Sequence, residues 1–592
     1  MILIINILTV TTIGTNVSKN NEDFMYPGQK KFSYAHSDIT DNIKNRNYRF
    51  QLNNQLGKVL WHFIDEKAFR SLVAFCKNSN YLFVGQEGYQ STENDHSIFQ
   101  LFKTHGNGNP IWKFDAPEYT SWMQIDASED SNVLVGLATS DMFDEKNHVA
   151  RLFKWDVENR NPTWYFDIPE ELHVFNGFFV EHNICVSDNG KKIALAANNF
   201  SQQLIKLFVF SPDSNEPVIT FPIYFDYQYV YINLIDISYD GKFVLISNDI
   251  ETIIIDTTIP EIRWRGDHDQ NRDTENYNIA AMSNDGSILA CQYWDYGHCV
   301  KIFKWDEKQN NYIDQKDLHI AERGWFISMS TYTLDLSDDG STLLVGVDDI
   351  DDFESRTKLV MFDIPTGKKI IDYETYAEGR YGNNIKEVKL SKDGSRGVVG
   401  YCDDEFNTNT ELKIFDKNKG DITFELDTPA GIGSVDISSN GGIVSGGGDL
   451  LPGPDGGIAG ISYCIDLDAN NNKPNNPTIK GKNKIRPGFK YTYTFSAIDP
   501  DGDEIYLYVD WGDGANTGWI GPYNSGEEVD LAHSWEKGSY EIKANARDIS
   551  CYNSEWVDFD IVSSKARFRQ GYLIDYLFKM LILKFPILKN LI

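Results

Sequence analysis

Three aspartates alternate with other residues in DPDGDE, residues 499–504, and their type and spacing could support metal chemistry. Carboxylates at alternate positions of a short loop can gather around Ca²⁺, an ion that takes oxygen ligands. Asp499, Asp501 and Asp503 are therefore candidate Ca²⁺ ligands. The loop departs from a complete EF-hand, because Asp510 occupies the twelfth position, where a Glu would bind the ion with two oxygens. A solvated turn between strands is the simpler interpretation, and a structural Ca²⁺ site is the alternative.

Signatures of the common catalytic classes are missing from the sequence. It has no GxSxG elbow, HExxH helix, GxxxxGK[ST] loop or kinase signature. The seven cysteines are scattered and form no CxxC pair, so no zinc site or dense disulfide framework is indicated. Cys291 and Cys299 could bridge a hairpin or remain free thiols. The sequence thus assigns no catalytic or cofactor-binding residue.

Composition favours short strands and argues against nucleic acid as a partner. The formal net charge is −32, from 87 acidic and 55 basic residues, and such a surface repels phosphate backbones. Aromatic residues make up 13% of the chain and there are 45 glycines, which suits many short strands joined by tight turns. We therefore expect an all-β protein.

A strand, turn and strand recur along the chain, as in TLDLSDDGSTLLVGVDD at 333–349. Asp or Asn followed by Gly tolerates the positive φ of a tight hairpin turn, and the preceding Ser can close the turn locally. Eight copies of the turn follow one another at steps of 45 to 59 residues, starting at positions 77, 128, 187, 238, 283, 337, 391 and 438.

Each copy continues into a third apolar stretch, and most continue into a fourth, such as PIWKFDAP at 110–117. The eighth copy lacks its fourth strand, whereas GKVLWHFID at 57–65 has the fourth-strand pattern with no repeat before it. A ring closed by this early strand beside residues 461–467 would remove two exposed sheet edges. Four-stranded units at a period of roughly 50 residues indicate propeller blades. The sequence predicts an eight-bladed β-propeller over about 51–469, with seven blades as the alternative.

Trp61, Trp112, Trp164 and Trp264 recur at one point of the fourth strand and are expected to pack between blades. Around them, GKVLWHF and GNPIWKF resemble strand endings of the pyrroloquinoline-quinone-like (quinoprotein) propellers, and LDLSDDGSTLLVG resembles WD-repeat propellers. The resemblance implies the fold only. Quinoprotein dehydrogenases carry an adjacent cysteine pair, which this sequence lacks, so the resemblance speaks against that cofactor.

A polar linker, residues 470–477, ends the repeats, and several short alternating strands follow over 478–563. DWGDG at 510–514, HSW at 533–535 and the pair Gly538 and Tyr540 resemble the PKD domain, an immunoglobulin-like β-sandwich of extracellular proteins. The resemblance implies that these residues shape a turn and the core, and that the module is a spacer or adhesion domain.

The two ends of the chain differ from its middle. Residues 1–20 are apolar enough for an incomplete export signal or anchor, and 21–50 form an N-terminal extension. The tail 564–592 is basic and apolar, but Pro586 and several charges argue against a clean membrane span. A helix lying on a membrane surface fits the tail better, and a helix packed on its own protein is the alternative. The tail also resembles the basic-then-apolar tails of some exported archaeal proteins.

These features favour an exported or cell-surface protein without catalytic activity. Its propeller loop faces would recognise a protein or glycan, and its role would be adhesion or scaffolding. The alternative is a hydrolase or lyase acting on extracellular glycans or peptides through carboxylates in the central channel. Raised carboxyl pKa values in a deep axial pocket would favour the enzyme, and shallow polar faces would favour binding. A pyrroloquinoline-quinone oxidoreductase is a third hypothesis, and failure to bind added quinone with Ca²⁺ would remove it.

Overall fold

The structure is a computed structural model. It describes residues 57–65, 68–76, 78–88, 97–119, 123–140, 149–174, 182–226, 230–248, 251–266, 279–294, 297–322, 333–350, 354–378, 384–402, 411–426, 428, 431–450, 459–549, 552–564, 576–577, 579–581 and 583–584.

Eight four-stranded antiparallel sheets make up the described part of the chain before residue 467. The first four sheets, in chain order, are β2 (Ala68–Cys76), β3 (Tyr81–Gly88), β4 (Ser97–Lys103) and β5 (Trp112–Ala116); β6 (Met123–Ala127), β7 (Val133–Thr139), β8 (Ala150–Asp156) and β9 (Trp164–Asp167); β10 (Ile184–Val186), β11 (Ile193–Asn199), β12 (Leu204–Phe210) and β13 (Pro217–Tyr224); and β14 (Ile232–Ile237), β15 (Phe243–Asn248), β16 (Thr252–Asp256) and β17 (Glu261–Arg265). The last four are β18 (Ile279–Met282), β19 (Ile288–Trp294), β20 (Gly297–Asp306) and β21 (Asn311–Glu322); β22 (Leu334–Leu336), β23 (Thr342–Ile350), β24 (Glu354–Asp363) and β25 (Lys368–Glu378); β26 (Asn384–Leu390), β27 (Arg396–Cys402), β28 (Leu412–Asp416) and β29 (Asp421–Leu426); and β30 (Gly431–Ile437), β31 (Ile443–Leu450), β32 (Ala459–Asp466) and β1 (Lys58–Asp65).

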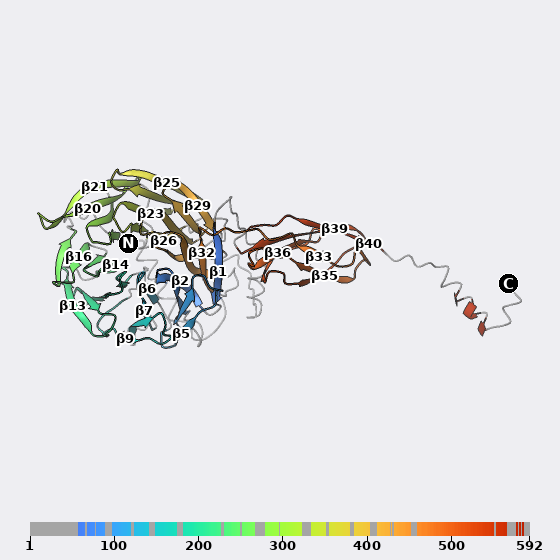
Figure 1. The fold of residues 1–592 in the computed structure, drawn as a ribbon, viewed down its shortest axis with the longest axis horizontal. Helices are drawn as coiled ribbons and strands as arrows, with labels where there is room; N and C mark the ends of the chain where they lie inside the picture. The colour runs from blue at the N-terminus through green and yellow to red at the C-terminus, as the bar shows by residue number, and fades with distance from the viewer. Residues whose placement is uncertain are drawn as a thin grey trace, which may run out of the picture.

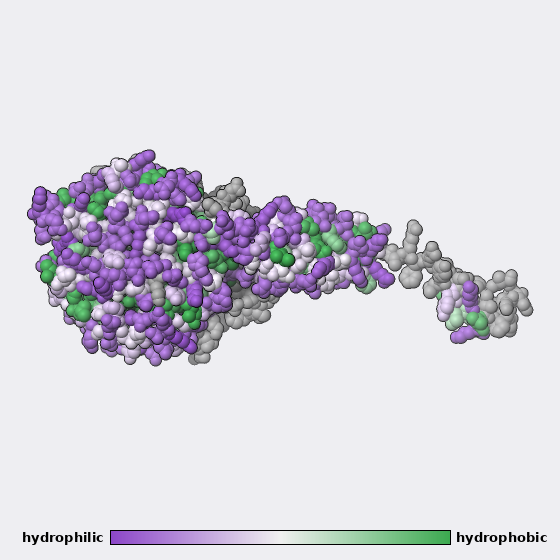
Figure 2. Space-filling model, viewed as in Figure 1, coloured by the Kyte–Doolittle hydropathy of each residue, from purple (hydrophilic) through white to green (hydrophobic). Residues whose placement is uncertain are grey.

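The eight sheets stand in a ring with the first strand of each sheet innermost (Figure 1). Each inner strand contacts the inner strand of the next sheet, from β2 through β6 and onward, and β30 of the eighth sheet contacts β2 of the first. The all-β prediction is confirmed, and the arrangement is consistent with a β-propeller. Much of the face seen in Figure 2 is hydrophilic, as expected for a strongly acidic chain.

The early strand β1 completes the last sheet, as the sequence predicted. It pairs antiparallel with β32, in a register that runs from Lys58 opposite Asp466 to Asp65 opposite Gly460. The sheet therefore joins residues from the two ends of the repeat array, and the outer edge of β32 is covered by β1.

From the second turn to the eighth, the first residue is a serine whose hydroxyl closes the turn. In the sixth sheet, the Ser337 hydroxyl donates to Asp339 Oδ1 at 2.8 Å and accepts the N–H of Thr342 at 2.9 Å. Gly340 has φ +67°, and a Cβ there would lie 2.7 Å from Ile288 of the preceding sheet. Glycine is thus required both by the turn and by the close approach of neighbouring sheets.

The recurring tryptophans pack between sheets, which confirms their predicted role. Three indole N–H groups donate at 2.8 to 2.9 Å to a backbone carbonyl of the next sheet, Trp61 to Thr104, Trp112 to Val157 and Trp164 to Pro212. Trp264 packs against Phe303 and Tyr312 of the fifth sheet, with ring centroids 5.3 and 5.5 Å apart.

Two further sheets follow a connection that runs from the end of β32 to Thr478. One contains β33 (Thr478–Lys480), β35 (Lys490–Ser496) and β38 (Val529–Ser534), and the other contains β34 (Lys484–Ile485), β40 (Val557–Ser563), β39 (Gly538–Asp548), β36 (Ile505–Asp510) and β37 (Asn516–Tyr523). They share one apolar core around Tyr493 and Trp535.

The residues that carry the PKD resemblance shape a turn and this core, as the resemblance implied. Trp511 stacks on His533 with ring centroids 4.8 Å apart, and the Trp535 indole N–H donates to the Trp511 carbonyl at 2.9 Å. His533 Nε2 lies 2.8 Å from Asp513 Oδ2. Gly512 has φ +75°, and a Cβ there would lie 2.4 Å from the Glu541 carbonyl oxygen.

The expected export signal and N-terminal extension lie outside the described residues. The described residues of the tail, at 576–577, 579–581 and 583–584, are helical, and Leu583 is 77% exposed. Among the described residues, no helix has the length and apolar character needed to cross a bilayer. Cys291 and Cys299 are buried thiols that form no disulfide with each other, because Cys291 lies opposite Lys301 and Cys299 lies opposite Tyr293.

Candidate functional site in the axial pocket

The repeated turns meet at one end of the ring and bond to one another. From the first turn to the eighth, a backbone N–H of each turn donates to a carbonyl of the next, as Asn284 does to Asp338 at 2.9 Å. Glu129 of the second turn links back to the eighth, because its Oε1 accepts the hydroxyls of both Ser79 and Ser439 at 2.8 Å. We call this set of turns the floor.

An ion pair crosses the floor. The Lys392 ammonium lies 2.8 Å from Asp188 Oδ2, and these residues belong to the seventh and third turns, which are opposite each other in a ring of eight sheets. The Asn284 amide donates to Asp188 at 3.1 Å and to Asp338 at 2.8 Å. The axis is therefore bridged by side chains at this end.

Four aspartates lie one layer above the floor, two residues before the turn serine of alternate sheets. We call them the inner tier: Asp126 of the second sheet, Asp236 of the fourth, Asp335 of the sixth and Asp436 of the eighth. In each, Oδ1 accepts the N–H of the following residue at 2.7 to 2.9 Å.

Three members of the inner tier also bind the next sheet through Oδ2. Each accepts a backbone N–H of the neighbouring inner strand at 2.6 Å: Asp126 from Val186, Asp335 from Leu390 and Asp436 from Phe75. A carboxylate that accepts amides from two sheets connects them without a covalent link. These bonds give the aspartates a structural role in the ring.

Burial dominates the electrostatics of the inner tier. It raises the pKa of Asp126 to about 7 and the pKa values of Asp236 and Asp436 to about 6, although backbone hydrogen bonds and Lys389 act in the opposite direction. Burial likewise raises the pKa of Glu387, one layer higher, to about 7.

Lys389 occupies the inner-tier position in the seventh sheet. Burial lowers its pKa, but Glu387 and the aspartates of the inner tier outweigh burial, so the net shift is upward. Among the described residues, none forms a hydrogen bond or an ion pair with its ammonium group. Three N–H donors therefore face the space along the axis.

That space is a pocket of about 100 Å³ above the inner tier. Its charged and ionisable lining residues are Arg70, Asp126, His182, Glu387, Lys389 and Asp436, and apolar side chains such as Leu72 and Val435 complete the wall. The turn residues are not among the lining residues, so the pocket ends before the floor.

Arg70 and Glu387 line the pocket further from the floor. Arg70 Nη2 lies 3.1 Å from Glu87 Oε2, while its Nε is buried without a hydrogen-bond partner among the described residues. Glu387 Oε2 accepts the N–H of Val435 at 2.7 Å. The lining thus combines the Lys389 ammonium with the Glu387 carboxyl group, which has one oxygen left to accept a hydrogen bond.

The sequence analysis placed carboxylates in the central channel for the enzyme alternative but named no residue. The sequence does contain a pattern that identifies them. Alternate copies of the repeat read QIDAS, LIDIS, TLDLS and SVDIS, and the seventh reads EVKLS.

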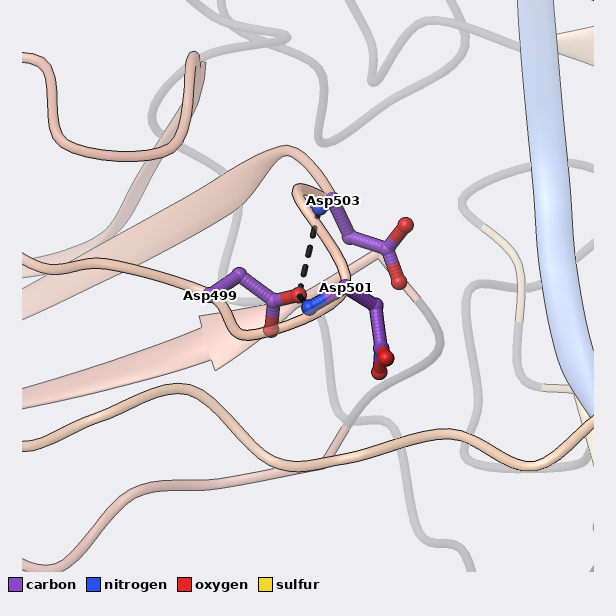
Figure 3. A group of neighbouring side chains, drawn as sticks. All are labelled: Asp499, Asp501 and Asp503. Carbon is purple, nitrogen blue, oxygen red and sulfur yellow. Dashed lines mark hydrogen bonds between the residues drawn. The ribbon is translucent and has the colours of Figure 1, made fainter.

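The predicted Ca²⁺ ligands come together beside the linker. Ligand atoms of Asp499, Asp501 and Asp503 lie within 4.8 Å of one another (Figure 3). Asp499 is 3% exposed, its Oδ1 accepts the N–H groups of Asp501 at 2.8 Å and Asp503 at 3.2 Å, and its buried Oδ2 has no hydrogen-bond partner among the described residues. Burial raises the pKa of Asp499. Ca²⁺ binding by this group stays a prediction.

Two of these aspartates also bind groups outside their loop. Asp501 accepts the backbone N–H of Asn472 at 2.6 Å and its side-chain amide at 3.0 Å. Asp503 lies 2.8 Å from the ammonium of Lys58 in β1. The loop therefore joins the sandwich both to the linker and to the closing strand of the ring.

The proteins found to be similar to this chain all come from a comparison with solved structures. No protein-family model and no curated protein matches the chain. The PKD domain of an M14-like peptidase from a Thermoplasmatales archaeon is 44% identical over 16% of this chain and 100% of its own, with a TM-score of 0.16. Hydrazine synthase from Kuenenia stuttgartiensis is 10% identical over 64% of this chain and 92% of its own, and Hsv2 from Kluyveromyces lactis is 11% identical over 65% and 95%, both with a TM-score of 0.35.

Proposed function

We propose that the chain is an exported or cell-surface binding protein without catalytic activity. In this proposal an eight-bladed β-propeller, closed by β1, recognises a protein or glycan, and an immunoglobulin-like sandwich of the PKD type holds the propeller at a distance from its anchor. The apolar, basic tail lies on a membrane surface.

The proposal rests on the hydrogen bonds that backbone N–H groups already make to the carboxylates of the inner tier. A general acid or base must bring a free oxygen within hydrogen-bond reach of its substrate. Asp126, Asp335 and Asp436 already direct both oxygens to backbone amides of two sheets. Such carboxylates hold the walls of a recognition pocket in place better than they move protons.

The tail supports a surface location. Its described apolar side chains are exposed, including Leu577 at 55% and Leu581 at 53%. An amphipathic segment with apolar residues and lysines gains free energy by burying the apolar face in a bilayer surface and pairing its charges with anionic lipid.

A direct test screens the full-length protein on peptide and glycan arrays and on vesicles of anionic and neutral lipid. We expect saturable binding to one class of array ligand, without turnover of that ligand, and binding to anionic vesicles that is lost when residues 565–592 are removed. Release of product from a bound glycan or peptide would contradict the non-catalytic proposal.

The second candidate is a hydrolase or lyase, and the raised carboxyl pKa values favour it. Glu387, with a pKa of about 7 and a place in the pocket wall, has the protonation behaviour expected of a general acid. If this candidate is right, Glu387→Gln abolishes turnover of a glycan or peptide that the wild type cleaves, and the wild-type rate falls as pH rises through about 7. Binding without turnover by the wild type would remove it.

A further inference from the structure

We propose that the axial pocket binds the polyol edge of a sugar, namely the terminal unit of a glycan, with Lys389 and Glu387 as the principal contacts. The inference rests on the proposed function, and it selects glycan over protein as the ligand class of the pocket.

The first step is the ammonium that lines the pocket. Lys389 has carboxylates as electrostatic neighbours, but no hydrogen bond or ion pair joins its ammonium group to another described residue. A ligand that displaces water from this ammonium group must replace the lost hydrogen bonds, because leaving the donor unpaired costs free energy. The ligand must therefore offer acceptor oxygens or nitrogens.

The second step is the excess of carboxylates around this ammonium group. Asp126, Glu387 and Asp436 line the same space, but only Glu387 directs a single oxygen, Oε2, to a backbone N–H, so its other oxygen can accept from a ligand. The ligand must therefore also offer donors.

The third step concerns charge. An anionic ligand would be repelled by the carboxylates of the lining, and a cationic ligand would be repelled by the Lys389 ammonium. Burial makes any uncompensated charge in this site costly. A neutral ligand with hydroxyl groups avoids both penalties, because one hydroxyl accepts from the ammonium and donates to a carboxylate at once. Neighbouring hydroxyls of a sugar ring have this character.

The fourth step is size and access. The cavity of about 100 Å³ is smaller than an engineered core cavity of roughly 150 Å³ that admits benzene, so it encloses part of a sugar ring and not a whole oligosaccharide. The bridge between Lys392 and Asp188 closes the axis below. The apolar wall formed by Leu72, Ile125 and Val435 would face the C–H groups of the ring.

The test titrates monosaccharides into the full-length protein by calorimetry and follows its melting temperature. The probes are glucose, galactose, mannose and N-acetylglucosamine, together with deoxy analogues of whichever sugar binds; acetate, methylammonium and glycine serve as charged comparisons. We expect one or more sugars to bind saturably and to raise the melting temperature, since a ligand that binds only the folded state stabilises it. Removal of one hydroxyl should weaken binding about tenfold or more.

Three variants locate the binding. Lys389→Met and Glu387→Gln should each weaken binding about tenfold to a hundredfold, as expected for loss of a charge-assisted hydrogen bond. Lys386→Met lies on the same strand but outside the pocket lining, and it should leave the affinity unchanged. If Lys389→Met fails to fold, Glu387→Gln and the deoxy analogues decide, because Gln has the same size as Glu.

Three outcomes would overturn the inference. They are no saturable sugar binding, sugar binding that neither Lys389→Met nor Glu387→Gln weakens, and tighter binding of a charged probe than of any sugar. An array ligand that binds equally well to the wild type and to Lys389→Met would leave the proposed binding function standing and remove only the pocket. Absence of any array ligand would instead count against the proposed function.

Discussion

The inner tier and the group of Asp499, Asp501 and Asp503 both bring carboxylates together, but their oxygens have different partners. In the inner tier, amides of two different sheets occupy the oxygens, and Lys389 supplies the positive charge. In the second group, most amides come from the same loop or the linker, and Asp499 keeps one buried oxygen without a partner among the described residues. Proximity of acidic side chains alone therefore does not define a binding site. The existing partners of each oxygen decide what it can still bind.

The same substitution in the two groups should have very different effects on stability. Asp436→Leu leaves the buried N–H groups of Phe75 and Ile437 unpaired, at about 1–3 kcal/mol each, so it should lower the free energy of unfolding by about 2–6 kcal/mol. Asp501 is exposed, and Asp501→Leu should change the free energy of unfolding by only about 0.5 kcal/mol. Denaturant unfolding of both variants measures the difference. Equal losses would show that the inner tier does not connect the sheets.

Stability should depend on pH through the inner tier. Because the folded-state pKa values of Asp126, Asp236, Asp436 and Glu387 are raised to about 6 or 7, the folded state binds more protons than the unfolded state near pH 5 to 6. This contribution is fully present below the unfolded pKa values and is lost as pH rises through 6 to 7. The free energy of unfolding should fall by several kcal/mol between pH 5 and pH 8, since one pKa unit corresponds to about 1.4 kcal/mol and four groups titrate in this range.

Calorimetric melting across this pH range checks the sign, and Asp126→Asn should flatten the profile because one titrating group is removed. Carboxyls held at low pKa by turn hydrogen bonds, such as Asp339, act only at lower pH. Stability that rises from pH 5 to pH 8 would contradict the burial of the inner tier.

Addition of Ca²⁺ should have the smallest effect on stability, and it should act only through Asp499, Asp501 and Asp503. At tenfold excess over its Kd, Ca²⁺ bound by Asp499, Asp501 and Asp503 would stabilise the protein by about 1.4 kcal/mol. Lys58 competes for Asp503, so Lys58→Met should tighten Ca²⁺ binding, while Asp499→Asn should weaken it. Titration calorimetry of the three proteins tests this order. No heat of Ca²⁺ binding with any of them would leave the loop as a solvated turn.

The repeats predicted the fold well because each strand boundary is local. Turn residues such as Asp339 and Gly340 mark where one strand ends and the next begins. The fourth-strand pattern at 57–65 has no repeat before it, so it required a partner strand elsewhere in the chain. The Asp499, Asp501 and Asp503 group was also predictable, since its members are two residues apart.

The axial pocket depends on contacts that spacing alone does not reveal. Asp436 and Phe75 are 361 residues apart, and their bond exists only because the ring brings the eighth sheet beside the first. Lys389 resembles an ordinary strand lysine until the other seven inner strands surround it. Local patterns therefore predict the strands, whereas the chemistry of the axis follows from closure of the ring.

Closure can be tested by a disulfide between β1 and β32. His62 lies opposite Tyr463 in the antiparallel register, so His62→Cys with Tyr463→Cys should form a bond under mild oxidation. The control pairs His62→Cys with Asp466→Cys, because Asp466 lies opposite Lys58 instead. We expect peptide mapping to find the cross-link between positions 62 and 463 and little or none between 62 and 466. Equal cross-linking in the two proteins, or none in either, would contradict a ring closed by β1.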